Sequence, residues 1–159
     1  MPIPDDSIAI CSFGDASANH ATAQTAFNAT QAALQDAEPA LDVHSLLRLQ
    51  QLVRDIEIGE HLVRHATRLV RATRPRETTV AAVKKHVGWG AGPRAGQALV
   101  LASKARALMQ GRLAVTRDDV QAMLLPVLAH RVLRNFEAEA DGVAMADILQ
   151  ALRSEIKVD

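Results

Sequence analysis

Apolar residues recur at helical spacing along most of the chain from Asp42 onward. Asp42 suits a helix N-cap, and the leucines and valines that follow it lie three and four positions apart, on one face of a helix. A second stripe of this kind runs from Leu62 to Val70, and a short extended link containing Ile56 and Ile58 separates the two. The pattern therefore predicts successive amphipathic helices.

Proline and glycine divide the following residues into further helices. Pro75 predicts the end of the second helix, and valines at positions 80, 83 and 87 predict a short third one. Gly92 suits an N-cap and Pro93 suits the first helical position, so a long helix is expected from there. Gly111 is placed to end that helix as a C′ glycine.

Two more helices are expected towards the C-terminal end. Thr116 and Asp119 resemble a capping box in which Asp replaces Glu. Pro126 is expected to break or restart the helix that they begin, and Val132 and Leu133 are expected to continue it. The last helix is expected from near Ala144.

These periodicities predict an all-α bundle of five to seven helices. Its buried core is expected to contain Leu46, Leu49, Val53, Leu62, Leu69, Leu99, Leu108, Val120, Leu124, Leu128 and Ile148.

The first residues follow a different pattern. Residues 7–12 form a short apolar run that suits a buried strand, and the alanine-rich residues 18–37 suit a helix. We expect residues 1–35 to form a separate N-terminal segment that is loosely attached to a helical domain of residues 36–159.

Composition narrows the class of protein. The chain has 159 residues, with 18 basic and 18 acidic side chains and a net charge of zero, which argues against a general nucleic-acid or membrane-surface binder. Cys11 is the single cysteine, no apolar run reaches membrane length, and the start lacks the basic region of a signal peptide. A cytoplasmic protein is therefore expected.

The residues Gly90 to Ala95 carry the most specific chemistry. They match the dinucleotide fingerprint G-x-G-x-x-G/A, but no pattern of a βαβ unit surrounds them, which disfavours a dinucleotide site. A helix that starts at Pro93 with Arg94 in its first turn could attract an anion through its free N–H groups, its dipole and the guanidinium. A plain helix entry explains the same residues equally well.

Other polar groups favour structural roles. His61 and His65 are spaced i, i+4, but no third metal ligand is evident, so a solvated or capping role is expected and no metal site is predicted. A polyanion could contact the arginines at 64, 68, 71, 74 and 76, although the neutral charge favours a solvated face paired with acidic neighbours. The sequence contains no nucleophile elbow, C-x-x-C or phosphate-binding loop, so no catalytic residue is predicted.

Several separated motifs resemble one family in the same order. Gly92-Pro93-Arg94-Ala95, Gly111-Arg112, Val115-Thr116, Asp118-Asp119-Val120, Pro126-Val127-Leu128 and His130-Arg131 resemble the C-terminal helical lid of MoxR-type AAA+ ATPases. The resemblance covers about residues 34–156.

The resemblance implies a lid-type helical bundle in which Arg94 is the second sensor. It would reach the γ-phosphate of ATP held by a separate core, with Gly92, Pro93 and Ala95 near the nucleotide. Mg²⁺ and ATP are implied only together with that core, since the phosphate-binding loop, Walker B acid and arginine finger belong to it. The implied partners are the core, neighbouring subunits and von Willebrand factor A-domain proteins, and the implied role is to couple ATP hydrolysis to chaperone-like remodelling. No ATPase activity is expected from this chain alone.

About residues 3–30 resemble a different family. Gly14 and Asp15 are similar to the G-D-x-S turn of thiamine-diphosphate-dependent 2-oxoacid dehydrogenases, in which the aspartate binds Mg²⁺. The second half of that motif is not found, and a lone carboxylate on a turn does not make a magnesium–diphosphate site. Asp15 is thus a weak candidate ligand for Mg²⁺, and a fragment of such a dehydrogenase is an alternative. A helical interaction protein without a nucleotide role is another.

Overall fold

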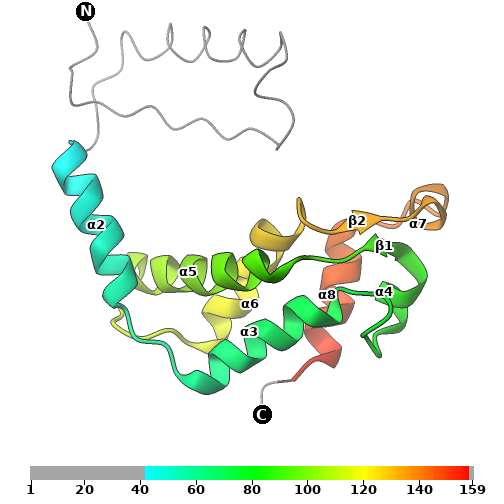
Figure 1. Cartoon of the computed structure of the whole chain (residues 1–159), viewed down its shortest axis with the longest axis horizontal. Helices are drawn as coiled ribbons and strands as arrows, with labels where there is room; N and C mark the ends of the chain where they lie inside the picture. Colours follow the sequence, from blue (N-terminus) through cyan, green and yellow to red (C-terminus); the bar gives the residue numbers. More distant parts are fainter. Residues whose placement is uncertain (1–41, 158–159) are drawn as a thin grey trace, which may run out of the picture. The chain divides into compact units, whose positions relative to one another are not determined.

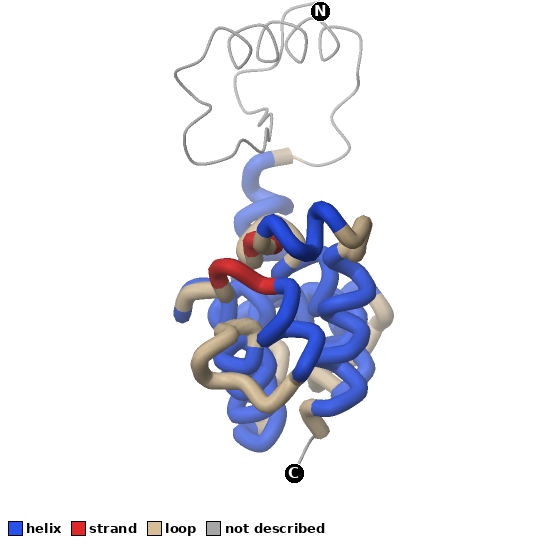
Figure 2. Tube along the Cα trace, turned by 90° about the vertical axis from the view of Figure 1, so that its right-hand side faces the viewer, coloured by secondary structure: helices blue, strands red, loops and turns tan. Residues whose placement is uncertain are grey.

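The computed structural model describes residues 42–157, which are mostly helical (Figures 1 and 2). The chain divides into two compact units, residues 1–51 and 52–159. The expected strand at 7–12, the helix at 18–37, Asp15 and the predicted boundary after residue 35 all lie outside the described residues. The all-α prediction is confirmed, with seven helices among the described residues.

Helix α2 (Val43–Asp55) begins where the sequence predicts. The Ser45 N–H donates a hydrogen bond of 2.6 Å to Asp42 Oδ1, and this bond holds the pKa of the Asp42 carboxyl below its usual value. The prediction that its apolar stripe is core was wrong, because Leu49 is exposed and Leu46 and Val53 are only half-buried. Periodicity identifies the apolar face of a helix, but it does not identify what covers that face.

Four helices enclose the main core. They are α3 (Glu60–Ala72), α5 (Pro93–Met109), α6 (Arg117–Leu128) and α8 (Met145–Glu155). Helix α5 packs along α6, and α3 contacts α5, α6 and α8. The remaining core predictions are confirmed, with Leu108 half-buried at the edge and the others fully buried: Leu62, Leu69, Leu99, Val120, Leu124, Leu128 and Ile148.

The extended link between α2 and α3 pairs with the segment between α5 and α6. The Glu57 N–H donates to the Leu113 carbonyl at 3.0 Å, and the Val115 N–H donates to the Glu57 carbonyl at 2.9 Å. The predicted extended conformation around Ile56 and Ile58 is thereby confirmed, and it satisfies backbone groups that would otherwise lack partners.

A small two-stranded sheet was not predicted. Helix α4 (Ala81–His86) runs directly into β1 (Val87–Trp89), which pairs antiparallel with β2 (Leu133–Arg134). Asn135 follows β2 and caps α7 (Phe136–Ala140) by accepting a hydrogen bond from the Ala138 N–H at 2.9 Å. An antiparallel pair of two and three residues cannot form a βαβ unit, so the structure agrees with rejecting the dinucleotide site.

Helix α6 continues through Pro126, contrary to the expected break, and ends at Leu128. The proline removes the N–H that would donate to the Ala122 carbonyl, so the helix lacks one hydrogen bond in the turn before Pro126. The expected continuation through Val132 and Leu133 was also wrong. Leu133 pairs with Trp89 in the small sheet.

Gly111 ends α5 as predicted, with φ of +70°. The Gly111 N–H donates to the Leu108 carbonyl, and the Arg112 N–H donates to the Ala107 carbonyl, each at 2.9 Å. These two bonds are the pattern of the Schellman motif, in which a left-handed residue satisfies the final carbonyls of the helix.

Gly111→Ala should destabilise the domain by about 1 kcal/mol, because only the left-handed conformation of an alanine opposes it. A new Cβ at position 111 has no atom within 4 Å, so a steric clash does not contribute. Gly96→Ala is the matched control, because position 96 also has free space but lies inside α5. Alanine is more stable than glycine inside a helix, so this variant should raise the free energy of unfolding by roughly 0.5–1 kcal/mol. Urea unfolding measures both, and a stabilised Gly111→Ala variant would contradict this explanation.

Candidate functional site

Arg94 lies exposed in the first turn of α5. Gly92 is the N-cap, with extended φ and ψ of −82° and 175°, and Pro93 occupies the first helical position, as predicted. Ala91 and Ala95, on either side, are each 1% exposed, so the backbone is fixed while Arg94 points away from the core. Within residues 42–157 Arg94 has no hydrogen bond or ion pair, which leaves its guanidinium free for an external anion.

The loop before α5 is fastened to the C-terminal end of α3 through Thr73. The Thr73 hydroxyl donates to the Val70 carbonyl at 2.6 Å and accepts from the Ala91 N–H at 2.9 Å. Thr73 is 1% exposed, so both hydrogen bonds are shielded from water. Ala91 lies three residues before Arg94, and this hydroxyl therefore helps to fix where α5 begins.

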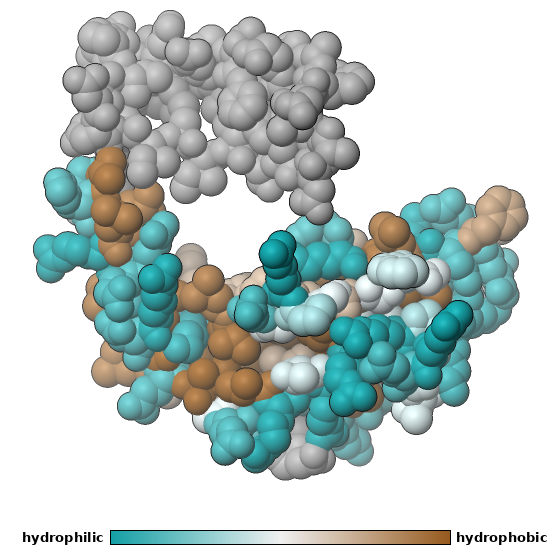
Figure 3. Space-filling view, in the orientation of Figure 1, coloured by the Kyte–Doolittle hydropathy of each residue, from teal (hydrophilic) through white to brown (hydrophobic). Residues whose placement is uncertain are grey.

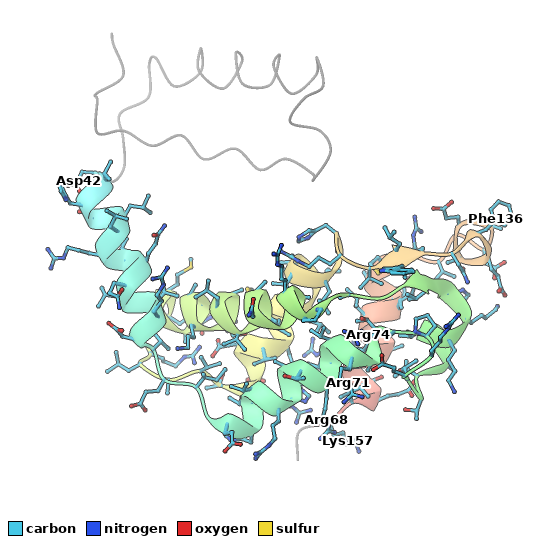
Figure 4. The ribbon with its side chains drawn as sticks, viewed as in Figure 1. Asp42, Arg68, Arg71, Arg74, Phe136 and Lys157 are labelled. Carbon is cyan, nitrogen blue, oxygen red and sulfur yellow. The ribbon has the colours of Figure 1, made fainter. Side chains whose placement is uncertain are left out.

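Arg74 adds a second connection to the same loop. Its Nε donates to the Ala91 carbonyl at 3.3 Å, and its Nη1 lies 3.1 Å from Glu77 Oε1. Arg71 contacts the other oxygen of Glu77 at 3.3 Å, and hydrogen bonds from Arg74 and then Arg71 hold the pKa of the Glu77 carboxyl below its usual value. Figure 4 shows Arg68 and Arg71 on α3 and Arg74 just beyond its C-terminal end.

The predicted arginine face is confirmed in part. Arg64 pairs with Glu60 at 2.7 Å, and Arg71 pairs with Glu77, so acidic neighbours do accompany these arginines. Arg74 is not simply solvated, however, because it is half-buried and contacts the loop that leads to Arg94. Arg74 therefore departs from the solvated face that the sequence favours.

Gly90 allows the close approach of the loop to α3. A Cβ at this position would lie 2.6 Å from the Thr73 carbonyl oxygen and 2.8 Å from the Arg74 Cα, both of them backbone atoms.

Gly90→Ala should therefore push the loop off α3 and destabilise the domain by about 1–3 kcal/mol. Gly92→Ala is the control, because a Cβ there meets nothing within 4 Å and only its poorer capping opposes it. Chemical denaturation of the two variants compares them, and equal stability would show that the close approach is unimportant.

Two hollows border this loop. One, of about 540 Å³, is lined by residues 74–77 and 87–92, and Trp89 on its wall is 71% exposed. The other, of about 530 Å³, is a mainly apolar groove between α3 and α5 that includes Val63, Val70, Pro93 and Val100. Figure 3 shows apolar surface in the region between these two helices.

A second polar cluster joins the end of α5 to the start of α6. The carboxylate of Asp119 is fully buried and accepts hydrogen bonds from both Nη atoms of Arg112 at 2.7 Å, from Arg106, and from the N–H and hydroxyl of Thr116 at 2.8 and 2.9 Å. The predicted capping box is thereby confirmed. The Arg112 hydrogen bonds, with Thr116 and Arg106 adding to them, hold the pKa of Asp119 far below its usual value. All of its partners belong to this domain, so the cluster is structural.

The two histidines are separated by the fold. His61 is exposed, whereas His65 is 2% exposed in the core, so the expectation of a solvated or capping role was wrong for His65. In residues 42–157 no three histidine, cysteine or acidic side chains come together in a way that could hold a metal ion. None of the helices in that part of the chain is long and apolar enough to cross a bilayer.

Part of the chain matches a known protein family. The family model described as "AAA lid domain" matches residues 79–152, which include the α5 start, the Asp119 cluster and most of α8. Residues 79–152 are therefore similar to an AAA lid domain. The lid match includes Arg94 and excludes Thr73 and α3, which lie before it.

Two curated proteins are similar to a longer part of the chain. Chaperone MoxR1 of Mycobacterium tuberculosis is 35% identical over 109 residues, which are 68% of this chain and 29% of MoxR1. The uncharacterized protein YeaC of Bacillus subtilis is 27% identical over 121 residues, which are 76% of this chain and 35% of YeaC. The chain thus spans about a third of the length of the curated relatives that it matches.

A solved structure shares the fold. The crystal structure of a candidate ATPase from Cytophaga hutchinsonii aligns with a TM-score of 0.71 at 23% identity, covering 86% of this chain and 43% of the other. This likeness supports the helical fold, and the family model and MoxR1 support the resemblance to an AAA lid. The resemblance of residues 3–30 to thiamine-diphosphate enzymes finds no support in these comparisons, and Gly14 and Asp15 lie outside the described residues.

The sequence predicted the helix start beside Arg94, which is confirmed, but it did not predict how Thr73, Arg74 and Gly90 meet across the loop before that helix. The contact of Thr73 with Ala91 joins residues 18 positions apart, which no periodicity reveals. The repeated glycines at 88, 90 and 92 were the available signal, because a glycine that is not needed for a turn often marks a close backbone approach.

Proposed function

We propose that this chain is the lid of a MoxR-type AAA+ ATPase and that Arg94 is its second sensor for the γ-phosphate of ATP. The observation that carries the proposal is an exposed arginine without a partner among the described residues, held in the first turn of a helix within the segment that is similar to an AAA lid domain. The similarity to Chaperone MoxR1 supports the narrower family assignment.

The local physics suits an anion that arrives from outside the lid. Pro93 has no N–H and the Ala95 N–H donates to the Gly92 carbonyl at 3.0 Å, so among the described residues the Arg94 N–H is the free donor of this turn. The helix dipole adds partial positive charge at this end. The Arg94 guanidinium adds two parallel donors that match phosphate oxygens. Because Ala91 and Ala95 are buried, the backbone that carries Arg94 is held in place before a ligand binds.

The proposal also assigns ATP and Mg²⁺ to a separate core. One arginine and one helix end supply neither the loop amides, nor the lysine, nor the metal ligands on which a complete nucleotide site depends. In the proposed mechanism the core holds the nucleotide, and the lid contacts the terminal phosphate of that nucleotide. This contact couples ATP binding and hydrolysis in the core to remodelling of client proteins. Proteins with von Willebrand factor A domains are proposed as partners by resemblance alone.

An addition experiment tests the function. A MoxR-type core from which the lid has been deleted is mixed with this chain, and ATP turnover is measured with Mg²⁺. The chain should raise turnover above that of the core alone, and the chain alone should hydrolyse no ATP. Absence of any gain at saturating chain would contradict the proposed function, and a helical interaction protein would then be the better description.

A further inference from the structure

Thr73 occupies a position that links α3 directly to the start of the sensor helix. Its hydroxyl donates to Val70 and accepts from the Ala91 N–H, at 2.6 and 2.9 Å, and the side chain is 1% exposed. A hydroxyl offers one donor and can accept as well, so one atom satisfies both groups. Among the ordinary side chains of this size only serine repeats that arrangement, whereas valine has the same shape without it.

Three further observations show that the loop has little freedom to move at this contact. Gly90 lies so close to α3 that a Cβ would come within 2.6 Å of the Thr73 carbonyl oxygen. Arg74 donates to the carbonyl of Ala91 while Thr73 accepts from its N–H, so both backbone polar groups of Ala91 are bound by two adjacent residues that directly follow α3. Ala91 is itself buried, which excludes water as a substitute partner.

From this geometry we infer that Thr73 is a positioning residue for Arg94: its hydroxyl sets the place at which α5 begins and thereby aims the guanidinium. The inference rests on the proposed function of Arg94. Thr73 precedes the segment matched by the lid family and is not itself placed to reach a nucleotide, since its side chain is buried against the loop. Small errors in the placement of a phosphate-binding group cost large factors in rate.

The test is a double-mutant cycle in the mixture of lid-deleted core and full chain. Thr73→Val should reduce the gain in ATP turnover about tenfold, and Thr73→Ser should restore most of it. In a chain that already carries Arg94→Ala, Thr73→Val should cause no further loss, because the group that it positions is gone. If the two losses multiply instead, Thr73 does not act through Arg94 and the inference is wrong.

Ser103→Ala is the matched control. Ser103 is also buried, and its hydroxyl donates to Leu99 within α5 at 2.7 Å, so this variant loses a buried hydroxyl far along the helix from Arg94. Its turnover gain should stay within about twofold of wild type at a temperature where all variants are folded. A tenfold loss in this control would show that any buried defect lowers the gain, which would overturn the assignment.

Hydrogen exchange separates failure of this inference from failure of the proposed function. The Ala91 amide should exchange at least about tenfold faster in Thr73→Val than in wild type or Thr73→Ser. If Arg94→Ala abolishes the gain while Thr73→Val leaves both the gain and the Ala91 exchange unchanged, the sensor stands and the positioning role is wrong. If wild type gives no gain, the proposed function fails and the positioning role fails with it.

Discussion

Asp119→Asn should unfold at a much lower temperature than the wild-type domain, with a loss of about 3 kcal/mol in unfolding free energy. The wild-type carboxylate is fully buried and accepts five hydrogen bonds, from Arg112, Arg106 and Thr116. Asparagine keeps the shape, but it replaces an acceptor oxygen by an NH₂ group that faces donors, and it leaves two arginines without their counter-charge. Breaking a buried ion pair usually costs about 3–5 kcal/mol, and the lower value is expected here because Arg106 and Arg112 are partly exposed.

Asp118→Asn is the matched control for that loss. Asp118 is the neighbouring aspartate in the same helical turn, but it is exposed, so its replacement should change stability by less than about 0.5 kcal/mol. Urea denaturation at pH 7 measures both variants. Similar losses in the two would show that the burial of Asp119 does not matter.

The difference between wild type and Asp119→Asn should depend on pH. The pKa of Asp119 in the folded domain lies below its usual value of 3.8, so the charged carboxylate stabilises the fold above that pH. This contribution is lost as the pH falls from 3.8 towards the folded-state pKa. The melting temperatures of wild type and Asp119→Asn should therefore converge in acid, and a constant difference down to pH 2 would contradict this origin of the stability.

Arg94→Ala should remove most of the gain in ATP turnover that the chain gives to a lid-deleted core. One charged hydrogen bond to a phosphate contributes about 1.5–3 kcal/mol, which corresponds to roughly a ten- to hundredfold loss. Arg94→Lys should recover only part of the gain, since the ammonium keeps the charge but not the planar pair of donors. Stability should hardly change in either variant, because the Arg94 side chain is exposed and has no hydrogen bond or ion pair with another described residue.

Arg117→Ala provides the control. Arg117 is also an exposed arginine in the first turn of a helix, α6, and it has no hydrogen bond or ion pair within the described chain. Its loss removes the same charge at a different helix start, so a general effect of net charge on binding the core would appear in both variants. Equal losses for Arg94→Ala and Arg117→Ala would show that the sensor assignment is wrong.

Local signals predicted much of this fold because they act within a few residues. The Asp42 and Thr116 caps, the Gly92-Pro93 helix start and the Gly111 helix end all depend on backbone groups within one helical turn. Long-range pairing was not predictable in the same way. The small sheet joins Val87 to Arg134, and strands of two and three residues leave no alternation to detect.

At the candidate site, too, local contacts were predictable from the sequence and long-range contacts were not. Arg94 was found because its motif is contiguous, and Asp119 was found as a cap because Thr116 is three residues away. The ion pair of Asp119 with Arg106 crosses from one helix to the next, and the Thr73–Ala91 hydrogen bond crosses from α3 to the α5 loop. Such contacts depend on how the helices pack, which a single sequence does not specify.

The most direct measurement is the affinity of this chain for a lid-deleted MoxR-type core in two nucleotide states. A sensor of the γ-phosphate can only respond by binding the core better when that phosphate is present. Calorimetric titration should therefore show at least about tenfold tighter binding to a core loaded with a slowly hydrolysed ATP analogue than to one loaded with ADP, and Arg94→Ala should reduce the ratio to near one. Equal affinities of the wild-type chain for the two states, or a ratio that survives Arg94→Ala, would contradict the account.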